Sequence, residues 1–108
     1  MMTRTRRSWK RHESAIAEKL GGTRNPCTGG QHSDVDAGPF AAEVKLRRSL
    51  PQWIHDAVDQ AARSAGERTP IVVLVESRQG IKARRYVLLR FEDFVDWHGS
   101  LEMTEVEQ

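Results

Sequence analysis

The chain has few of the residues on which disulfides, zinc sites and membrane spans depend. Cys27 is the one cysteine among 108 residues, so an intramolecular disulfide is impossible and a reducing cytoplasm is the expected setting. No apolar run approaches the ~20 residues of a membrane helix, and no apolar segment follows the basic N-terminus as in a signal peptide. With only 38% hydrophobic residues and no internal repeat, the sequence predicts one domain with a modest core.

Several catalytic classes also lack their residues. The histidines do not have the spacing of zinc ligands, and all four are expected at the surface or its boundary: His12, His32, His55 and His98. No spacing supports a Ser-His-Asp or Cys-His hydrolase. The glycine-rich GGTRNPCTGG segment lacks the Lys-Ser/Thr ending of a nucleotide-binding loop.

Charge is plentiful and unevenly distributed. The net charge is only +2, but the N-terminus is basic and the C-terminus carries Glu102, Glu105 and Glu107. A basic body beside an acidic tail favours a polyanionic partner, although any single arginine could simply be solvated. The cations expected to contact DNA phosphates are Arg6, Arg7, Lys10, Arg11, Arg24, Arg47 and Arg48, with Lys82, Arg84 and Arg85 as further candidates.

Hydrophobic periodicity predicts three helices and five strands. The helices are expected at 8–20, from a Ser49 cap to about Ala65, and at 91–98; the strands at 23–24, 34–36, 40–46, 70–75 and 85–90. The run PIVVLV at 70–75 is typical of a central strand buried on both faces. The pattern predicts an α/β domain with a mixed sheet at 8–99, a flexible basic arm at 1–7 and a frayed acidic tail at 100–108.

The segment from Asp34 to Lys45 carries the candidate chemistry. Side chains alternate along a strand, so Glu43 and Lys45 should emerge together on one face while Val44 points the other way. Asp34 precedes Glu43 by nine residues, across a turn at Ala37-Gly38-Pro39. A Glu-x-Lys pair alone is more often a solvated surface ion pair, so the combination with Asp34 is what indicates a site.

Hard oxygen ligands of this kind suit Mg²⁺ or Mn²⁺. Asp34 and Glu43 offer two carboxylates, and the Val44 carbonyl offers a third oxygen. Lys45 could position the attacking water or stabilise developing negative charge beside a phosphodiester. Asp36 is a competing carboxylate nearer the turn.

Two residues outside this segment are weaker candidates. Glu13 falls on the inward stripe of the first helix, where a carboxylate needs a cation, a metal or a water-filled cleft. It could hold the metal through water, or it could pair with Lys10 or reach solvent. Gln60 borders the apolar stripe of the second helix and could reach a water or phosphate, or could be an ordinary surface residue.

Between Trp9 and Ala65 the chain resembles the PD-(D/E)XK nuclease superfamily, and more closely the archaeal-type and phage Holliday junction resolvases. The resemblance is carried by the Glu13 helix and by the segments LGGTRNPCTGG, DVD, AAEVK, RRSLPQW and DQA. It implies a restriction-endonuclease-like αβββαβ core, with a mixed central β-sheet flanked by helices. It also implies Mg²⁺-dependent cleavage by Asp34, Glu43 and Lys45, with Glu13 assisting and Gln60 secondary. No proline precedes Asp34, where the superfamily name would put one.

The resulting hypothesis is a metal-dependent DNA endonuclease that resolves four-way junctions as a homodimer, in the cytoplasm of a bacterial or phage-infected cell and without a membrane partner. The alternatives are a non-catalytic DNA-binding module of the same fold and a related nuclease acting on flaps, nicks or mismatches. Nothing in the sequence indicates a helix that reads base edges.

Overall fold

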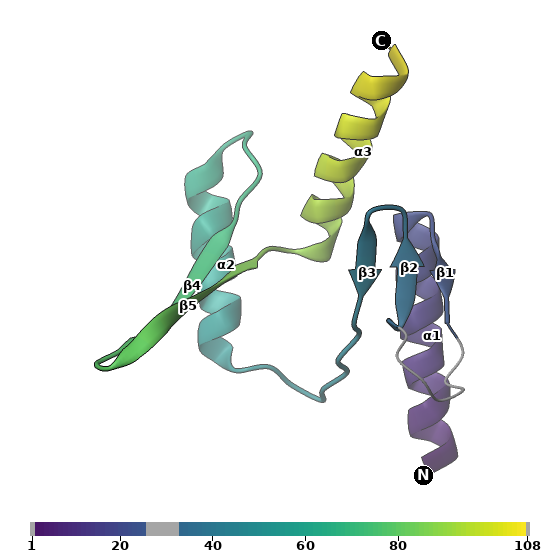
Figure 1. Ribbon diagram of the computed structural model, residues 1–108, viewed down its shortest axis with the longest axis horizontal. Helices are drawn as coiled ribbons and strands as arrows, with labels where there is room; N and C mark the ends of the chain where they lie inside the picture. Colours follow the sequence, from purple (N-terminus) through teal and green to yellow (C-terminus); the bar gives the residue numbers. More distant parts are fainter. Residues whose placement is uncertain (1, 26–32, 108) are drawn as a thin grey trace. The chain divides into compact units, whose positions relative to one another are not determined.

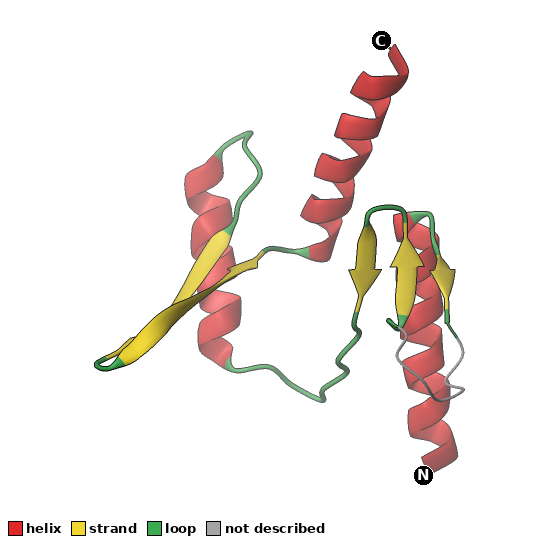
Figure 2. Ribbon diagram, viewed as in Figure 1, coloured by secondary structure: helices red, strands yellow, loops and turns green. Residues whose placement is uncertain are grey.

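The computed structural model describes residues 2–25 and 33–107, with side chains described for 8–25 and 33–99 (Figures 1 and 2). Cys27 and His32, and with them most of the predicted loop, lie outside the described residues. The elements are α1 (Met2–Leu20), β1 (Thr23–Arg24), β2 (Val35–Ala37), β3 (Phe40–Ala42), α2 (Gln52–Ala65), β4 (Val72–Arg78), β5 (Ile81–Leu88) and α3 (Phe91–Glu107). Their order confirms the predicted order of helices and strands, and the α/β class is confirmed.

The chain divides into two compact units, Met1–Arg48 and Ser49–Gln108. Strand pairing is antiparallel throughout the described ranges: β1-β2-β3 form one sheet and β4-β5 form another. These pairings do not form a single mixed central sheet, because each strand pairs only with strands of its own unit. The restriction-endonuclease-like core remains a prediction.

The ends of the helices differ from the expected ones. α1 already begins at Met2, so residues 2–7 are helical, and α3 continues to Glu107 through the expected tail. α2 begins after Pro51 without a side-chain cap, so the predicted Ser49 cap is wrong. Among the described helices, none has the length and apolar character needed to cross a membrane.

The first unit is built by packing α1 on its three-stranded sheet. Val35 and Ala37 alternate with exposed Asp36 along β2, so both apolar side chains face α1, where they meet Ala17 in a small core. Between β2 and β3 the chain turns at Gly38-Pro39, as predicted. Gly38 has φ +55°, the left-handed conformation that a type II′ hairpin requires at its first central position.

The predicted strand at 40–46 is too long, because β3 ends at Ala42. The alternation nevertheless continues beyond that residue: Val44 and Leu46 are half-buried, while Glu43 and Lys45 are exposed. The segment therefore keeps the facing that the sequence predicts although ladder pairing has stopped.

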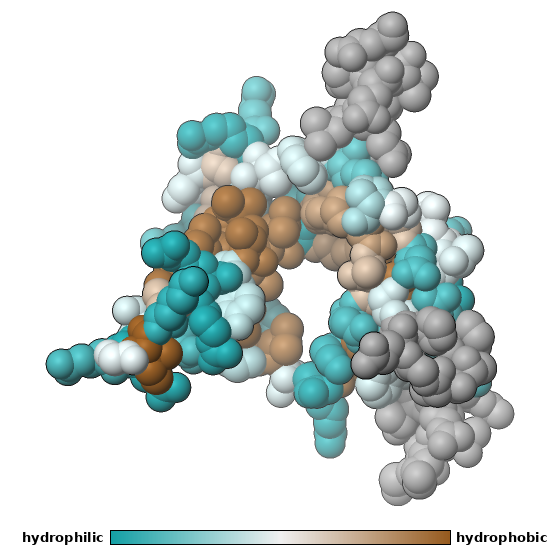
Figure 3. Space-filling model, in the orientation of Figure 1, coloured by the Kyte–Doolittle hydropathy of each residue, from teal (hydrophilic) through white to brown (hydrophobic). Residues whose placement is uncertain are grey.

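The second unit contains the β4–β5 ribbon, which packs against α2 through β4. Gly80, with φ +83°, closes a tight turn, so β5 begins at Ile81 rather than at the predicted Arg85. Val73 and Val75 are 53% and 56% exposed, so the expectation of a strand buried on both faces is wrong. The reason is that β4 has one strand neighbour and one helix-covered face. Hydrophobic residues lie toward the α2 end of the ribbon, and hydrophilic ones dominate toward its free end (Figure 3).

The junction of α1 with β2 gives the first prediction. A Cβ added at Gly22 would lie 2.0 Å from the Asp36 carbonyl oxygen and 2.6 Å from the Ala37 Cα, closer than real Cβ atoms approach backbone. We expect Gly22→Ala to lower the free energy of unfolding by about 1–3 kcal/mol, because backbone must move to relieve the overlap. Urea denaturation followed by circular dichroism measures this loss.

Gly99 provides the matched control. It lies within α3, and a Cβ there would meet no atom within 4 Å. The same substitution at Gly99 should be neutral or should stabilise the helix by up to about 1 kcal/mol. Equal urea midpoints for the two variants would contradict the close packing of α1 on β2.

Candidate active site

Asp34 is fixed between β1 and the chain beyond β3. Its carbonyl oxygen accepts the N–H of Asn25 at 2.9 Å, and its carboxylate Oδ2 accepts the N–H of Val44 at 2.7 Å. The last ladder pair of β2 and β3 is Val35 with Ala42, so the carboxylate acts where the next ladder bond would form. A negatively charged acceptor thus ends the strand and holds Asp34 beside the Glu43–Lys45 segment.

Glu43 and Lys45 lie on the exposed side of that segment. Val44, between them, packs against the core of the first unit, which directs its two neighbours outward. Neither Glu43 nor Lys45 forms an ion pair in the part of the chain that the structure describes. The competing interpretation of a surface ion pair is therefore not what the geometry shows, and both side chains remain available beside Asp34.

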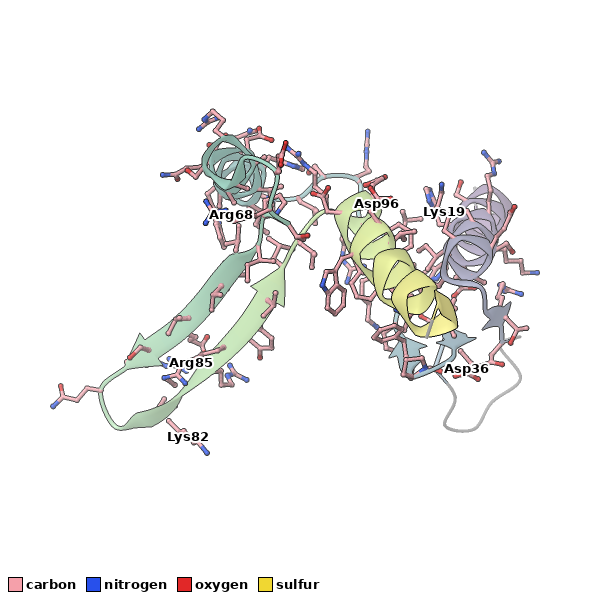
Figure 4. All side chains as sticks on the ribbon, turned by 90° about the horizontal axis from the view of Figure 1, so that it is seen from above. Lys19, Asp36, Arg68, Lys82, Arg85 and Asp96 are labelled. Carbon is pink, nitrogen blue, oxygen red and sulfur yellow. The ribbon has the colours of Figure 1, made fainter. Side chains whose placement is uncertain are left out.

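Asp36 has a different environment from Asp34. It lies on the side of the sheet away from α1 (Figure 4) and accepts hydrogen bonds from the Ser33 hydroxyl and, at 2.8 Å, from the Asn25 side-chain amide. The same amide group donates to the Ser33 carbonyl at 2.9 Å. Both Asp36 oxygens therefore have structural partners, one at the end of β1 and one just before β2, so Asp34 remains the preferred candidate for a metal ligand.

Glu13 is buried as the sequence predicts, but its partner is an arginine. Arg24 stands opposite Val35 in the ladder, so its side chain leaves the sheet on the face that meets α1. Its Nε donates to Glu13 Oε1 at 2.7 Å, with side chains 24% and 8% exposed respectively. The expected alternatives of pairing with Lys10 or reaching solvent are wrong. The cation that a buried carboxylate needs comes from β1.

This ion pair bears on two predicted roles. The carboxylate of Glu13 is committed to Arg24 beneath the sheet, whereas Glu43 is on the exposed side of its segment. The structure thus brings Asp34 to Glu43 and Lys45 but does not bring Glu13 into the same group. The guanidinium of Arg24 is likewise directed inward, so its predicted contact with DNA remains a prediction.

Among the described residues no three His, Cys, Asp or Glu side chains gather as a metal cluster. Magnesium usually retains several waters and binds through one or two carboxylates, so a site formed by Asp34, Glu43 and the Val44 carbonyl remains a prediction. In this arrangement Glu13 does not fit as a direct ligand.

The remaining predicted residues lie elsewhere. Gln60 is exposed on α2 in the second unit, so its secondary role remains a prediction. Arg6 and Arg7 belong to α1, with side chains outside the described set. Four of the predicted DNA-contacting cations of the first unit are exposed: Lys10, Arg11, Arg47 and Arg48. Three histidines have described side chains. His12 and His55 are exposed, and His98 is half-buried against Phe94.

Sequence reasoning missed the roles of Asn25 and Ser33, and it missed Arg24 as the partner of Glu13. The signal for Arg24 was present: a predicted inward carboxylate and a cation on the first short strand. The signal for Asn25 and Ser33 was weaker, since both are ordinary loop residues whose proximity depends on the strand register.

The buried ion pair gives the second prediction. Arg24→Ala should lower the free energy of unfolding by about 3 kcal/mol, because it leaves the Glu13 carboxylate buried without a partner. Adding Glu13→Gln to that variant should restore a large part of the loss, since a neutral amide costs less to bury. Thermal and urea denaturation of the single and double variants measure the difference. Equal free energies of unfolding for the single and the double variant would show that the unpaired Glu13 carboxylate is not costly to bury.

No protein-family model matches the chain, and neither a curated protein nor a solved structure matches it. Its function must therefore be inferred from the Asp34–Lys45 segment, the Glu13–Arg24 pair and the distribution of charge.

Proposed function

We propose that the chain is a Mg²⁺-dependent DNA endonuclease of the PD-(D/E)XK type. The observation that carries the proposal is the 2.7 Å hydrogen bond between the Asp34 carboxylate and the Val44 amide. It joins Asp34, which directly precedes β2, to the backbone between Glu43 and Lys45, so two parts of the chain that are separated in sequence are held together. Two carboxylates can hold a magnesium ion, and an ammonium group can stabilise the charge that develops during metal-assisted phosphodiester hydrolysis.

Each residue has a distinct role in this proposal. Asp34 and Glu43 would hold the metal, with the Val44 carbonyl as a further oxygen ligand. When bound, the ion would polarise the phosphate and make its water a better nucleophile. The Lys45 ammonium orients the attacking water and stabilises the negative charge that develops on the phosphate oxygens. The Val44 amide keeps the Asp34 carboxylate in one orientation, which limits the reorganisation required when substrate arrives.

A four-way junction is the proposed substrate, and a homodimer in the cytoplasm is the proposed form. Exposed cations at Lys10, Arg11, Arg47 and Arg48 support binding to phosphates without base readout. A substrate recognised through its backbone is selected by shape, and two sites at a fixed separation can match the two strands cut in a junction. Mg²⁺ is the proposed cofactor, with Mn²⁺ as its functional substitute.

The third prediction concerns cleavage itself. With Mg²⁺, the protein should nick a synthetic four-way junction, and Glu43→Gln or Lys45→Met should reduce the rate by at least ~100-fold, since each removes a group that acts on developing charge. The controls are Glu67→Gln and Lys19→Met, which make the same changes at exposed residues that are not part of the proposed site. Single-turnover rates measured with labelled junctions, duplexes, flaps and mismatches at one salt concentration also test the substrate. Normal cutting by the Glu43 and Lys45 variants would reject the site.

The fourth prediction separates the two neighbouring aspartates. Asp34→Asn retains an oxygen that can accept the Val44 N–H but loses the charge, so it should abolish cleavage and lose about 1 kcal/mol of stability while the protein stays folded. Asp36→Asn should retain cleavage and lose a similar amount of stability, because it weakens the bonds from Asn25 and Ser33. Nicking rates distinguish the two variants, and urea midpoints show that both are folded. The reverse pattern of cleavage would make Asp36 the ligand.

One observation favours a second candidate function, a DNA-binding module without catalysis. The third acid, Glu13, is held by Arg24 instead of standing with Asp34 and Glu43. This alternative predicts junction binding that Asp34→Asn leaves unchanged, with no nicking at any Mg²⁺ or Mn²⁺ concentration. Binding in EDTA followed by addition of metal distinguishes it from the endonuclease.

A further inference from the structure

Positive charge is concentrated in two elements. α1 contains six cations and two acids, and the β4–β5 ribbon contains four cations and one acid, giving +4 and +3. The whole chain has a net charge of +2, so the residues outside these two elements sum to −5. The ribbon is therefore a local basic feature on a chain that is otherwise acidic outside α1.

Three of the ribbon's four cations have no acidic partner among the described side chains. Arg84 donates from Nε and Nη2 to Glu76 Oε1 at 2.9 and 2.6 Å, which neutralises one cation. Arg78, Lys82 and Arg85 are exposed, and within the described ranges they form no ion pair. Three uncompensated cations thus stand within eight residues, around the turn at Gln79-Gly80.

The register distributes these cations over both faces. Residues directly opposite each other share a face, so Arg85 lies with Val75 and Arg84 with Glu76. Between the pairs Glu76–Arg84 and Arg78–Ile81, β4 has one residue and β5 has two, so the extra residue lies in β5 and interrupts the alternation there. Alternation along β4 is unbroken, and it places Arg78 on the face of Glu76 and Arg84, opposite the face of Arg85. Lys82 and Arg85 both lie in the part of the ribbon nearer its free end (Figure 4).

We propose that the free end of the β4–β5 ribbon is a DNA-binding arm that seats in a groove of a duplex, with the cations on its two faces contacting the phosphates on either side. A two-stranded ribbon is one of the elements that the major groove admits. The proposal rests on DNA as the partner in the proposed function. It adds a contact separate from Asp34, Glu43 and Lys45, which belong to the other unit.

Charge placement favours DNA over a lipid surface. A membrane-binding face needs its cations and its apolar groups on one side. The exposed apolar residues Val73 and Val87 do share a face with Arg85, but Arg78 projects from the opposite face. Cations on two faces suit a partner with phosphates on both sides, which a groove provides.

The fifth prediction tests the arm with a matched pair of variants. Lys82→Gln/Arg85→Gln removes two cations from the ribbon, and Arg63→Gln/Arg68→Gln removes two from α2 and the turn after it. Binding to a labelled duplex is measured in EDTA, from 50 to 300 mM salt, so that cleavage plays no part. The ribbon variant should bind at least ~10-fold more weakly at low salt and reduce the slope of log K against log salt by about two, as expected for two lost phosphate contacts. The α2 variant should keep the wild-type slope.

Three outcomes would overturn the inference: wild-type binding by the ribbon variant, an equal loss in both variants, or a loss confined to anionic lipid vesicles. Circular dichroism shows whether each variant is folded, and Glu76→Gln/Arg84→Gln, which leaves the net charge unchanged, controls for damage to the ribbon. Failure of the endonuclease would appear as absent nicking with binding intact. Failure of the arm would appear as binding that does not depend on Lys82 and Arg85.

Discussion

The first unit depends on the placement of one carboxylate. Asp34 accepts the Val44 N–H with its side chain while its carbonyl accepts the Asn25 N–H, so it links the two outer parts of the sheet. A charged acceptor makes a stronger bond than a backbone carbonyl, which allows the ladder to end at Ala42 without leaving the Val44 amide unsatisfied. The same bond leaves the chain from Glu43 to Lys45 extended and exposed on one side. Asp34 therefore both ends the β2–β3 ladder and holds the segment that carries the other residues of the proposed site.

The buried ion pair sets a second constraint. A carboxylate in the packed region between α1 and the sheet is stable only with a partner, and Arg24 meets that need from the β1 position facing the helix. Any role for Glu13 in catalysis would require the Arg24 guanidinium to move away. The Glu13 carboxylate would then be buried without a partner. The pair therefore explains why the proposed site relies on two acids, and magnesium, with its retained waters, is the ion for which two acids suffice.

Much of the element order followed from the sequence because its signals are local. Gly21-Gly22, Gly38-Pro39 and Gly66 fix where chain segments end, and alternation fixes which way Glu43 and Lys45 face. Local signals could not predict which residues would contact each other across the sheet. Whether Arg24 turns inward depends on its register with Val35, and the end of β3 depends on the Asp34 side chain, which binds the Val44 N–H ten residues later. The apolar PIVVLV run misled for the same reason, since its burial is decided by what packs on each face and not by its composition.

Taken together, the two units divide the proposed task between chemistry and attachment. In the first unit the exposed Arg47 and Arg48 follow the Glu43–Lys45 segment directly, so in the proposed function a phosphate would be attracted close to where it is hydrolysed. The ribbon of the second unit carries an excess of cations and, apart from the paired Glu76, no acid that would bind a metal. An element with that composition can attract a backbone but cannot cleave it. Binding should therefore persist when the acids of the site are neutralised, and this separation is what allows the catalytic and non-catalytic proposals to be distinguished experimentally.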